Sequence, residues 1–399
     1  MAGPLQGYRV VELAEGVAGP YCGSALGDAG ADVIKIEKPA GDRTRGWGSR
    51  AKGDLGAVFQ NINRSTRSVV LDPDSNDGAA IIKKLVAGAD VVVADAGFTK
   101  HPDLQPDALL AANPRLVYAN LSEFGENGPQ GNLPPYGELV AQLASEATTS
   151  LGEIGETAVR LGNDNASMYT GIFATQAICA ALFAVDQQGG QRLDVSLFGA
   201  MLFMRSTLWV ALSNPDYWWG FHLDSYVKPP EYGYRCSDGA IMLSLNGVTQ
   251  EQRDAIYKEF DMEWVRDDPM FEMFNQDTAG VGRYAHVVRP LWDKGLSKFP
   301  MDHVITKMRE LGGQAWPKNT YEMMVNSDQV KFIGMVKPVE TPEGPLDQMV
   351  PPWEFAETPA EIQRPAPRLG EHTAEVLAEA GFTAAEISGF RSRGILVTA

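Results

Sequence analysis

Residues Tyr8–Lys38, YRVVELAEGVAGPYCGSALGDAGADVIKIEK, contain the pattern that decides the fold of this protein. The stretch opens with a β-type run, YRVVELAEG, and continues as AGPYCGSALGDAG, which has helical spacing and ends in glycine. It closes with ADVIKIEK, a second run rich in β-branched residues and flanked by charge. A strand, a helix and a second strand in this order predict a β–α–β unit with parallel strands.

The alternation of strands and helices continues along the chain. RSVVLD, DVVVAD and RLVYANLSEFG are strand patterns, NDGAAIIKKLVAG predicts a helix opened by Asn76 or Asp77, and PDALLAANP predicts a helix stopped before Pro114. Further helices are expected over Tyr136–Ser150 and Ser167–Asp186, and RLDVSLFGAMLFM predicts a strand leading into a helix. The fold class is therefore α/β, with a large domain built on a Rossmann-like parallel, doubly wound sheet. The NAD fingerprint is absent, because no GxGxxG follows the first strand.

The composition changes near Pro215, which indicates a second domain in a chain too long for one efficient core. The segment NPDYWWGFHLDSYVKPPEYGYRC is dense in aromatic residues and prolines, as a linker or a pocket wall would be. YGYRCSDGAIMLSL predicts a hairpin turned by Asp238 and Gly239, and the short helices and strand after it predict a smaller α+β domain. The tail, LGEHTAEVLAEAGFTAAEISGFRSRGIL, predicts two short amphipathic helices separated at Gly381.

Charge and cysteine content narrow the class of function. The net charge of −17 argues against a nucleic-acid partner. Three scattered cysteines without a CxxC pair, and no His/Asp/Glu cluster with ligand spacing, indicate neither a disulfide framework nor a metal site. With no signal-peptide pattern and no run able to span a membrane, we expect a cytoplasmic protein. Cations gather near the N-terminus and either hold a small polyanion or form a solvated basic face: Lys35, Lys38, Arg43, Arg45, Arg50, Lys52, Arg64 and Arg67.

Five segments stand in a fixed order along the chain: VVELAEGVAGPYCGSALGDAGADVIKIEKPAGDRTRGWG, NRSTRSVVLD, ANPRLVYANLSEFGENGP, GGQRLDVSLF and RPAPRLGEHTAEVLAEAGF. Together they resemble the class III coenzyme A transferases (CaiB/BaiF family), which include formyl-CoA, carnitine-CoA and benzylsuccinate CoA-transferases and the 2-methylacyl-CoA racemases. The resemblance implies a large CoA-binding domain from residues 1–215, a small domain with its linker from 216–335, and a return to the large domain over 336–399. It also implies two chains threaded through each other as interlocked rings, with CoA or acyl-CoA as substrate and neither metal nor NAD.

The same resemblance assigns the coenzyme contacts. Val17 and Ala18 would line the first loop beside the pantetheine arm, and Lys38 stands where many relatives carry an arginine that contacts the nucleotide. Lysine keeps the charge without the bidentate fork of arginine. Asp95 and Ala96 replace an Asn-Phe pair that helps to clasp the coenzyme, so a carboxylate stands near a polyanion. Leu71 completes the expected cofactor-binding set.

Ser167 stands at the position of the family's catalytic aspartate. That carboxylate attacks the acyl-CoA thioester to give a mixed anhydride, and CoA thiolate then returns to give an aspartyl-CoA thioester. A serine would form an ordinary ester, a poor acyl donor, and would need a general base. We interpret Ser167 as a helix N-cap and pocket-lining residue rather than a nucleophile. Asp164 is the best local substitute nucleophile, although a capping role suits it too.

The segment before Ser167 carries two further candidates for the substrate pocket, Tyr136 and Glu138. Racemases of the family pair the aspartate with a histidine, and Tyr136 occupies the histidine position here, which makes racemase activity a weak alternative. Three hypotheses remain. The chain is the aspartate-lacking subunit of a heteromeric transferase resembling succinyl-CoA:(R)-benzylsuccinate CoA-transferase, with a homologous aspartate-containing partner and a carboxylic acid as acceptor. It is a homodimeric transferase using Asp164 or another acid. Or it is an acyl-CoA-binding pseudoenzyme.

Overall fold

The computed structural model describes residues 3–50, 53–131, 164–204, 206, 233–276 and 285–396. The described residues form two compact units. The first holds those up to 131, 164–203 and 328–396, and the second holds those from 204 to 327. The helix expected over Tyr136–Ser150 lies outside the described residues.

A six-stranded sheet with the order β3-β2-β1-β4-β5-β6 forms the centre of the first unit, and every neighbouring pair is parallel. This is the order of doubly wound dinucleotide folds, so the predicted Rossmann-like sheet is confirmed. The strand order reverses between β1 and β4, which makes the gap beyond their carboxyl ends the topological switch point. The strands are β1 (Arg9–Leu13), β2 (Asp32–Glu37), β3 (Thr66–Val70), β4 (Val91–Asp95), β5 (Val117–Ser122) and β6 (Gln191–Ser196).

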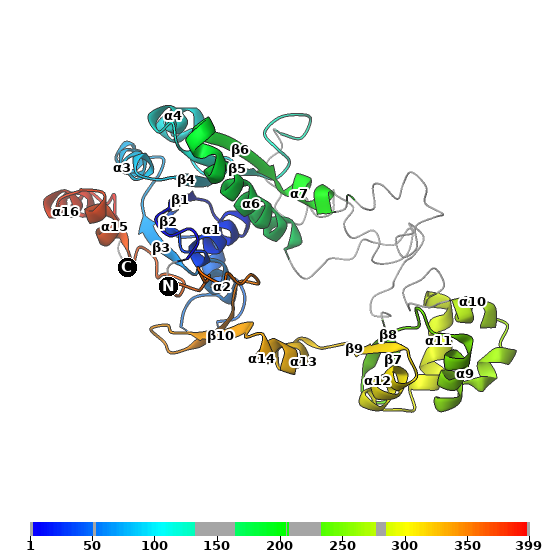
Figure 1. Cartoon of the computed structure of the whole chain (residues 1–399). Helices are drawn as coiled ribbons and strands as arrows, with labels where there is room; N and C mark the ends of the chain where they lie inside the picture. Colours follow the sequence, from blue (N-terminus) through cyan, green and yellow to red (C-terminus); the bar gives the residue numbers. More distant parts are fainter. Residues whose placement is uncertain are drawn as a thin grey trace. The chain divides into compact units, whose positions relative to one another are not determined.

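Helices cover both faces of this sheet. Figure 1 shows α1 and α6 on one face and α3, α4 and α15 on the other, where valines, leucines and isoleucines of the strands and helices form a buried core. α3 begins at Asn76, one of the two residues predicted to open it, and the side chain of Ser75 caps it. The helices are α1 (Ala18–Asp28), α2 (Ala57–Ile62), α3 (Asn76–Ala87), α4 (Pro106–Ala112), α6 (Asn165–Gln188) and α7 (Leu197–Met204), with short 3-10 turns η1 (Arg43–Gly46) and η2 (Pro102–Leu104).

Gly171 lets α6 approach α1 closely. A Cβ on Gly171 would lie 2.9 Å from the carbonyl oxygen of Ala18, so a side chain there would push the two helices apart. The glycine stands one turn after Ser167, which is therefore held beside the start of α1. This contact brings a segment from the middle of the chain to the edge of the sheet where α1 begins.

The outer face of α6 is apolar and exposed. Among the described residues it is the one helix long and apolar enough to cross a membrane, which is weak evidence because core helices pass the same test. It packs against α1 and the strands β5 and β6, as a core helix does. Phe183 on its outer side is 88% exposed, and Phe203 and Met204 of α7 are also exposed, which is unusual for side chains of this size.

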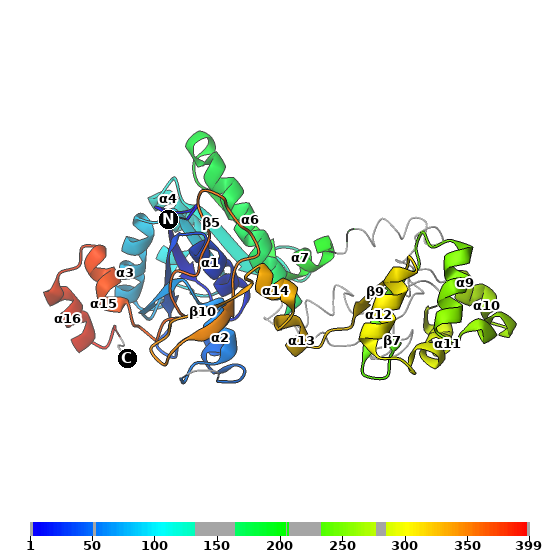
Figure 2. The ribbon, with the colours of Figure 1, turned by 60° about the horizontal axis from the view of Figure 1, so that its bottom comes forward.

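The C-terminal segment packs against β3. His372 donates a backbone hydrogen bond to the carbonyl of Ser68, and Arg67 forms ion pairs with Glu375 and Glu379 at 2.9 Å each. The tail contains the two predicted short helices, which Figure 2 shows beside α3, and a preceding antiparallel hairpin. These elements are α14 (Asp328–Phe332), β10 (Val336–Val339), β11 (Leu346–Met349), α15 (Thr373–Glu379) and α16 (Ala384–Ser392).

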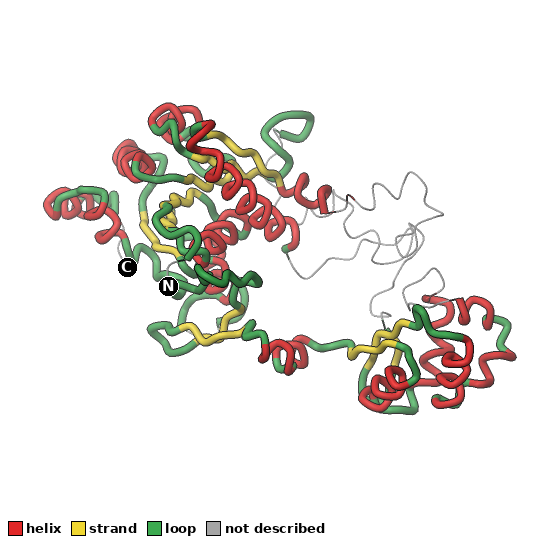
Figure 3. The backbone as a smooth tube through the Cα atoms, viewed as in Figure 1, coloured by secondary structure: helices red, strands yellow, loops and turns green. Residues whose placement is uncertain are grey.

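The second unit combines a three-stranded antiparallel sheet, β7-β8-β9, with short helices, as the colouring of Figure 3 shows. The hairpin turned at Asp238 and Gly239 joins β7 to β8, as predicted. Buried aromatic residues, Tyr257, Phe274 and Trp292 among them, form its core. Its elements are β7 (Tyr234–Arg235), β8 (Ala240–Ser244), α9 (Gln250–Glu259), η4 (Glu263–Asp267), α10 (Phe271–Gln276), α11 (Ala285–Leu296), α12 (Met301–Glu310), β9 (Gln314–Pro317) and α13 (Tyr321–Val325).

Candidate functional site

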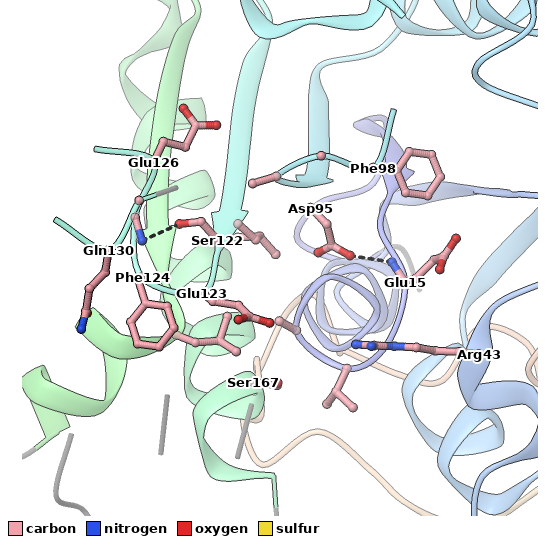
Figure 4. Close-up of a pocket in the computed structure, with 18 of the residues that line it drawn as sticks. Glu15, Arg43, Asp95, Phe98, Ser122, Glu123, Phe124, Glu126, Gln130 and Ser167 are labelled. Atoms are coloured by element: carbon pink, nitrogen blue, oxygen red, sulfur yellow. Dashed lines mark hydrogen bonds between the residues drawn. The ribbon is translucent and has the colours of Figure 1, made fainter. Parts of the chain in front are cut away.

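A cleft of about 380 Å³ opens at the switch point of the sheet. Ligands of doubly wound folds bind beyond the carboxyl ends of the strands at this point. Most of the lining residues belong to the loops that follow β1, β2, β4 and β5. Ser167, in the first turn of α6, also lines the cleft (Figure 4). The lining residues are Glu15, Val17, Ala18, Lys38, Arg43, Asp95, Ala96, Gly97, Phe98, Leu121, Ser122, Glu123, Phe124, Gly125, Glu126, Gln130, Gly131, Ser167 and Leu197.

Two acidic side chains hold the loop after β1 in place. Asp95, the last residue of β4, accepts a hydrogen bond from the backbone N–H of Glu15 at 2.8 Å (Figure 4). Asp42 accepts one from the backbone N–H of Gly16 at 3.3 Å. Gly16 has φ of +83°, a conformation that glycine adopts without strain. The loop therefore takes its shape from carboxylates that belong to two other segments.

A buried charge network lies beneath this loop. The Lys35 ammonium contacts Oε1 of Glu12 at 2.7 Å and Oδ2 of Asp42 at 2.9 Å, and none of the three side chains is exposed. Burial disfavours the charge on Lys35, but Glu12 and Asp42 outweigh it and raise the pKa of Lys35. Burial would also raise the pKa of Asp42, but Lys35 and the donors of Thr44 hold it below its usual value. For Glu12 burial prevails, so its pKa is raised despite Lys35.

The N-terminal basic cluster does not converge on the cleft as a whole. Four of its cations pair with carboxylates elsewhere: Lys35 with Glu12, Arg45 with Glu37, Arg64 with Asp28, and Arg67 with Asp32. Arg50 is exposed and lies near Asp54. Of the described cations of the cluster, Lys38 and Arg43 are the two that line the cleft. The expectation of a solvated basic face is therefore wrong for Lys35 and Arg67, which are buried, and binding of a polyanion by Lys38 and Arg43 stays a prediction.

These two cations enter the cleft from the segment after β2. Lys38 lies 3.5 Å from Oε1 of Glu15 and over the ring of Phe98, 4.7 Å from its centre. Arg43 passes directly over the loop after β1, because a Cβ on Gly16 would lie 2.4 Å from its Nη2. Figure 4 shows its guanidinium extending toward the start of α1. The sequence predicts that Lys38 contacts the ligand, whereas it identifies Arg43 only as a member of the N-terminal basic cluster.

Asp95 is the most perturbed acid that lines the cleft. Burial raises its pKa to about 7, although the N–H of Glu15 and the positive charges of Lys35 and Arg43 act to lower it, and Glu12 adds to the rise. A carboxyl group with this pKa changes its charge near neutral pH. It can accept or donate a hydrogen bond to a ligand depending on its protonation.

Ser167 lines the cleft but does not cap its helix. The N-cap of α6 is Asp164, whose Oδ1 accepts a hydrogen bond from the backbone N–H of Ser167 at 3.1 Å, so the predicted capping role of Ser167 is wrong. Ser167 is the third residue of α6, and its backbone N–H is one that an N-cap side chain accepts. Ser167 is therefore the donor in the capping hydrogen bond and Asp164 the acceptor. Ser167 is only 2% exposed, and in the described part of the chain its hydroxyl makes no hydrogen bond. None of the described lining residues is a histidine.

Some of the other predicted site residues line the cleft and others do not. Val17, Ala18, Asp95 and Ala96 line the cleft with Lys38. Leu71 follows β3 and is fully buried in the core, because its apolar side chain packs inward. Leu71 is therefore not among the lining residues, contrary to the prediction. Tyr136 and Glu138 lie outside the described residues.

Sequence reasoning missed the wall that follows β5. Ser122, Glu123, Phe124, Glu126 and Gln130 line it. The signal was available, because carboxyl ends of parallel strands meet at one edge of the sheet and SEFGEN directly follows the β5 pattern. Glu126 accepts a hydrogen bond from Asn120 at 3.0 Å and pairs with Arg192, which orients this wall. Among the described residues no group of His, Cys, Asp and Glu could hold a metal ion.

Comparisons with known proteins agree on a family. The family model described as CoA-transferase family III matches residues 5–373. The succinate–glutarate CoA-transferase of Agrobacterium fabrum is 31% identical over 94% of this chain and 95% of its own length. The succinyl-CoA–L-malate CoA-transferase alpha subunit of Chloroflexus aurantiacus is 27% identical over 98% of this chain and 92% of its own. The crystal structure of a CaiB/BaiF family protein from Brucella suis superposes with a TM-score of 0.78 at 26% identity, covering 95% of this chain and all of that one.

Proposed function

The chain belongs to CoA-transferase family III, and we propose that it takes part in moving coenzyme A from an acyl-CoA to a carboxylic acid. The observation that carries the proposal is the cleft at the switch point, where Val17, Ala18, Lys38 and the first turn of α6 meet. The family resemblance implies that these segments hold an acyl-CoA. Lys38 supplies a positive charge for a phosphate, and Phe98 and Phe124 supply apolar surface for the pantetheine arm.

The acids transferred are proposed to be dicarboxylic, with succinyl-CoA as the donor. Two similar relatives are named for succinate, glutarate and malate, and each of these acids carries two carboxylates. (R)-Benzylsuccinate, the acid of the heteromeric transferase that the chain resembles, belongs to the same chemical class. A second carboxylate on the ligand would suit a cleft whose lining includes Arg43 as well as Lys38.

The chain is proposed to act with a homologous partner that supplies the catalytic aspartate. CoA transfer through an anhydride requires a carboxylate as nucleophile, and Ser167 offers only a hydroxyl. The lining residues that the structure describes include no histidine that could act as an imidazole base for that hydroxyl. The name of the Chloroflexus relative describes an alpha subunit, so relatives with more than one kind of subunit are known. Interlocked pairing of the two chains, and a cytoplasmic location, remain predictions.

Asp164 is a poor substitute nucleophile. Its Oδ1 caps α6 by accepting the N–H of Ser167, and this hydrogen bond makes the carboxylate a weaker nucleophile. An attack by Asp164 would require the cap to open. This observation favours a second candidate function over the homodimeric transferase: the chain binds acyl-CoA and has no turnover with any partner. The racemase alternative gains no support, because Tyr136 lies outside the described residues.

Co-expression with a homologous chain from the same genome that keeps the aspartate tests the proposal. The purified chain alone should bind succinyl-CoA but transfer no CoA to succinate, glutarate, malate or benzylsuccinate. The co-purified pair should transfer CoA, and an Asp→Ala change in the partner should abolish this activity. Binding without turnover by every such pair would favour the acyl-CoA-binding function. No binding of any acyl-CoA would refute the proposal.

A further inference from the structure

The described lining of the cleft holds more acidic than basic side chains, although the proposed ligand is a polyanion. The acids are Glu15, Asp95, Glu123 and Glu126, and the described cations are Lys38 and Arg43. Carboxylates would repel the phosphates of a CoA ligand, so these acidic side chains have a function other than phosphate binding. Hydrogen bonds and ion pairs hold the backbone beside Arg43 and the carboxyl of Asp95 in place.

The position of Arg43 is fixed through its neighbour Asp42. Oδ1 of Asp42 accepts hydrogen bonds from the N–H of Thr44 at 2.8 Å, the hydroxyl of Thr44 at 2.7 Å and the N–H of Gly16 at 3.3 Å. Its Oδ2 contacts the buried Lys35 ammonium at 2.9 Å. Because Asp42 is held on both oxygens, the backbone that carries Arg43 cannot shift freely. The missing side chain at Gly16 leaves the space through which the guanidinium reaches the cleft.

The carboxyl of Asp95 is fixed by the loop that follows the neighbouring strand β1. Oδ2 accepts the N–H of Glu15 at 2.8 Å, and Oδ1 lies 3.6 Å from the place where a Cβ on Gly19 would stand. The first turn of α1 thus lies against this carboxyl. The charged and titratable groups around it are Glu12 and Glu15 from β1 and its loop, Lys35 and Lys38 from β2 and its loop, Arg43 from η1, and Glu123 and Glu126 after β5.

We propose that Arg43 and Asp95 together form the subsite for the free carboxylate of a dicarboxylic acyl group, a step that rests on the proposed CoA transfer. The planar guanidinium matches a carboxylate through two parallel hydrogen bonds. Asp95 in its protonated form donates a hydrogen bond to the same carboxylate, and in its ionised form repels it.

The location suits an acyl group that reaches from this subsite to the first turn of α6. Arg43 packs on Gly16, and α6 packs on Ala18 through Gly171, one turn after Ser167. Only Val17 separates Gly16 from Ala18, so the two contacts lie at most about 7 Å apart along the chain. Arg43 and Ser167 therefore flank one short segment of the same cleft. A ligand with its thioester near Ser167 places a distal carboxylate on the side of Arg43.

Binding of two matched ligands tests the pair. Succinyl-CoA and butyryl-CoA have acyl chains of equal length and differ in the terminal carboxylate, so their affinity ratio isolates this subsite from all other CoA contacts. In calorimetric titrations of the full chain, Arg43→Gln should weaken succinyl-CoA binding by about ten-fold or more and leave butyryl-CoA binding nearly unchanged. Arg43→Lys should have an intermediate effect. The control Arg50→Gln removes an exposed cation outside the cleft lining and should change neither affinity.

The pH dependence of the same ratio tests Asp95. The preference for succinyl-CoA should fall as pH rises from about 6 to 8, because Asp95 ionises near pH 7. Asp95→Asn keeps an acceptor for the N–H of Glu15 and should make the ratio independent of pH. Equal weakening of both ligands in Arg43→Gln, no change in either, or a pH dependence that persists in Asp95→Asn overturns this subsite. If neither acyl-CoA binds to the unmodified chain, the CoA-transferase proposal fails with it, so the two failures are distinguishable.

Discussion

The side chain of Asp164 holds the backbone N–H of Ser167 at 3.1 Å, which fixes the first turn of α6 at the mouth of the cleft. The carboxylate of Asp164 caps the helix. The hydroxyl of Ser167 is buried at the cleft and makes no hydrogen bond to the described residues. The two residues therefore divide the roles of cap and pocket wall. Each role predicts a different effect of mutation on stability.

Removal of the cap should destabilise the protein more than removal of the cleft hydroxyl. Asp164→Ala should lower the free energy of unfolding by about 1 kcal/mol, since the N–H of Ser167 loses its acceptor and the helix N-terminus loses a negative charge. Ser167→Ala should change it by less than about 0.5 kcal/mol, because no hydrogen bond of the hydroxyl is lost. Urea unfolding monitored by circular dichroism measures both. The opposite ranking would contradict this division of roles.

Lys35 should be among the costliest single residues to replace in the large unit. Lys35→Met leaves the carboxylates of Glu12 and Asp42 buried without their cation, which should cost about 3–5 kcal/mol. The matched control is Lys83→Met on α3, where an exposed lysine lies 3.4 Å from Asp103 and contributes at most about 1 kcal/mol. Chemical unfolding at neutral pH compares the two. Similar losses in both variants would mean that the buried network adds nothing to stability.

The sheet and its helices could be predicted from the sequence because the spacing of apolar residues differs between strands and helices. β1, β2 and β4 are runs of valine and isoleucine buried on both faces, and α3 has a clear apolar stripe. The place of the site followed from the family resemblance. Arg43 could not be singled out, since its entry into the cleft depends on Gly16 and on the anchoring of Asp42 by Lys35. Such contacts join residues far apart in the sequence, and no local pattern reveals them.

Lys38→Glu should weaken the binding of acyl-CoA and CoA alike. The side chain lines the cleft over Phe98, and a charge reversal there would place a carboxylate next to Glu15 and the ligand phosphates. Calorimetry with CoA should show at least a ten-fold loss, and the wild-type affinity should fall with added salt because charge–phosphate contacts are screened. Lys83→Glu, a reversal on the distant surface of α3, provides the control. Unchanged affinity in Lys38→Glu would remove this residue from the site.

The protein should form a dimer that dilution does not separate. The exposed apolar face of α6, with Phe183 88% exposed, requires cover that the described residues of this chain do not provide. Interlocked chains cannot part without unfolding, so sedimentation velocity should give one species of about twice the chain mass at all concentrations tested. A compact monomer at low concentration would contradict the interlocked arrangement. A dimer that dissociates reversibly would indicate ordinary face-to-face pairing instead.

Ser167→Asp tests the prediction that Ser167 occupies the position of the family's catalytic aspartate. An aspartate in the first turn of α6 is favourable for the helix, so the variant should fold. It should transfer CoA from succinyl-CoA to succinate without a partner chain, and hydroxylamine or borohydride should trap an adduct on residue 167. Ser167→Asn has nearly the same shape without a nucleophilic carboxylate and should stay inactive. The wild-type chain alone should also be inactive, because a serine ester is a poor acyl donor to a carboxylate. Robust transfer by the wild-type chain that disappears in Ser167→Ala would contradict this argument, since it would make the hydroxyl of Ser167 the nucleophile.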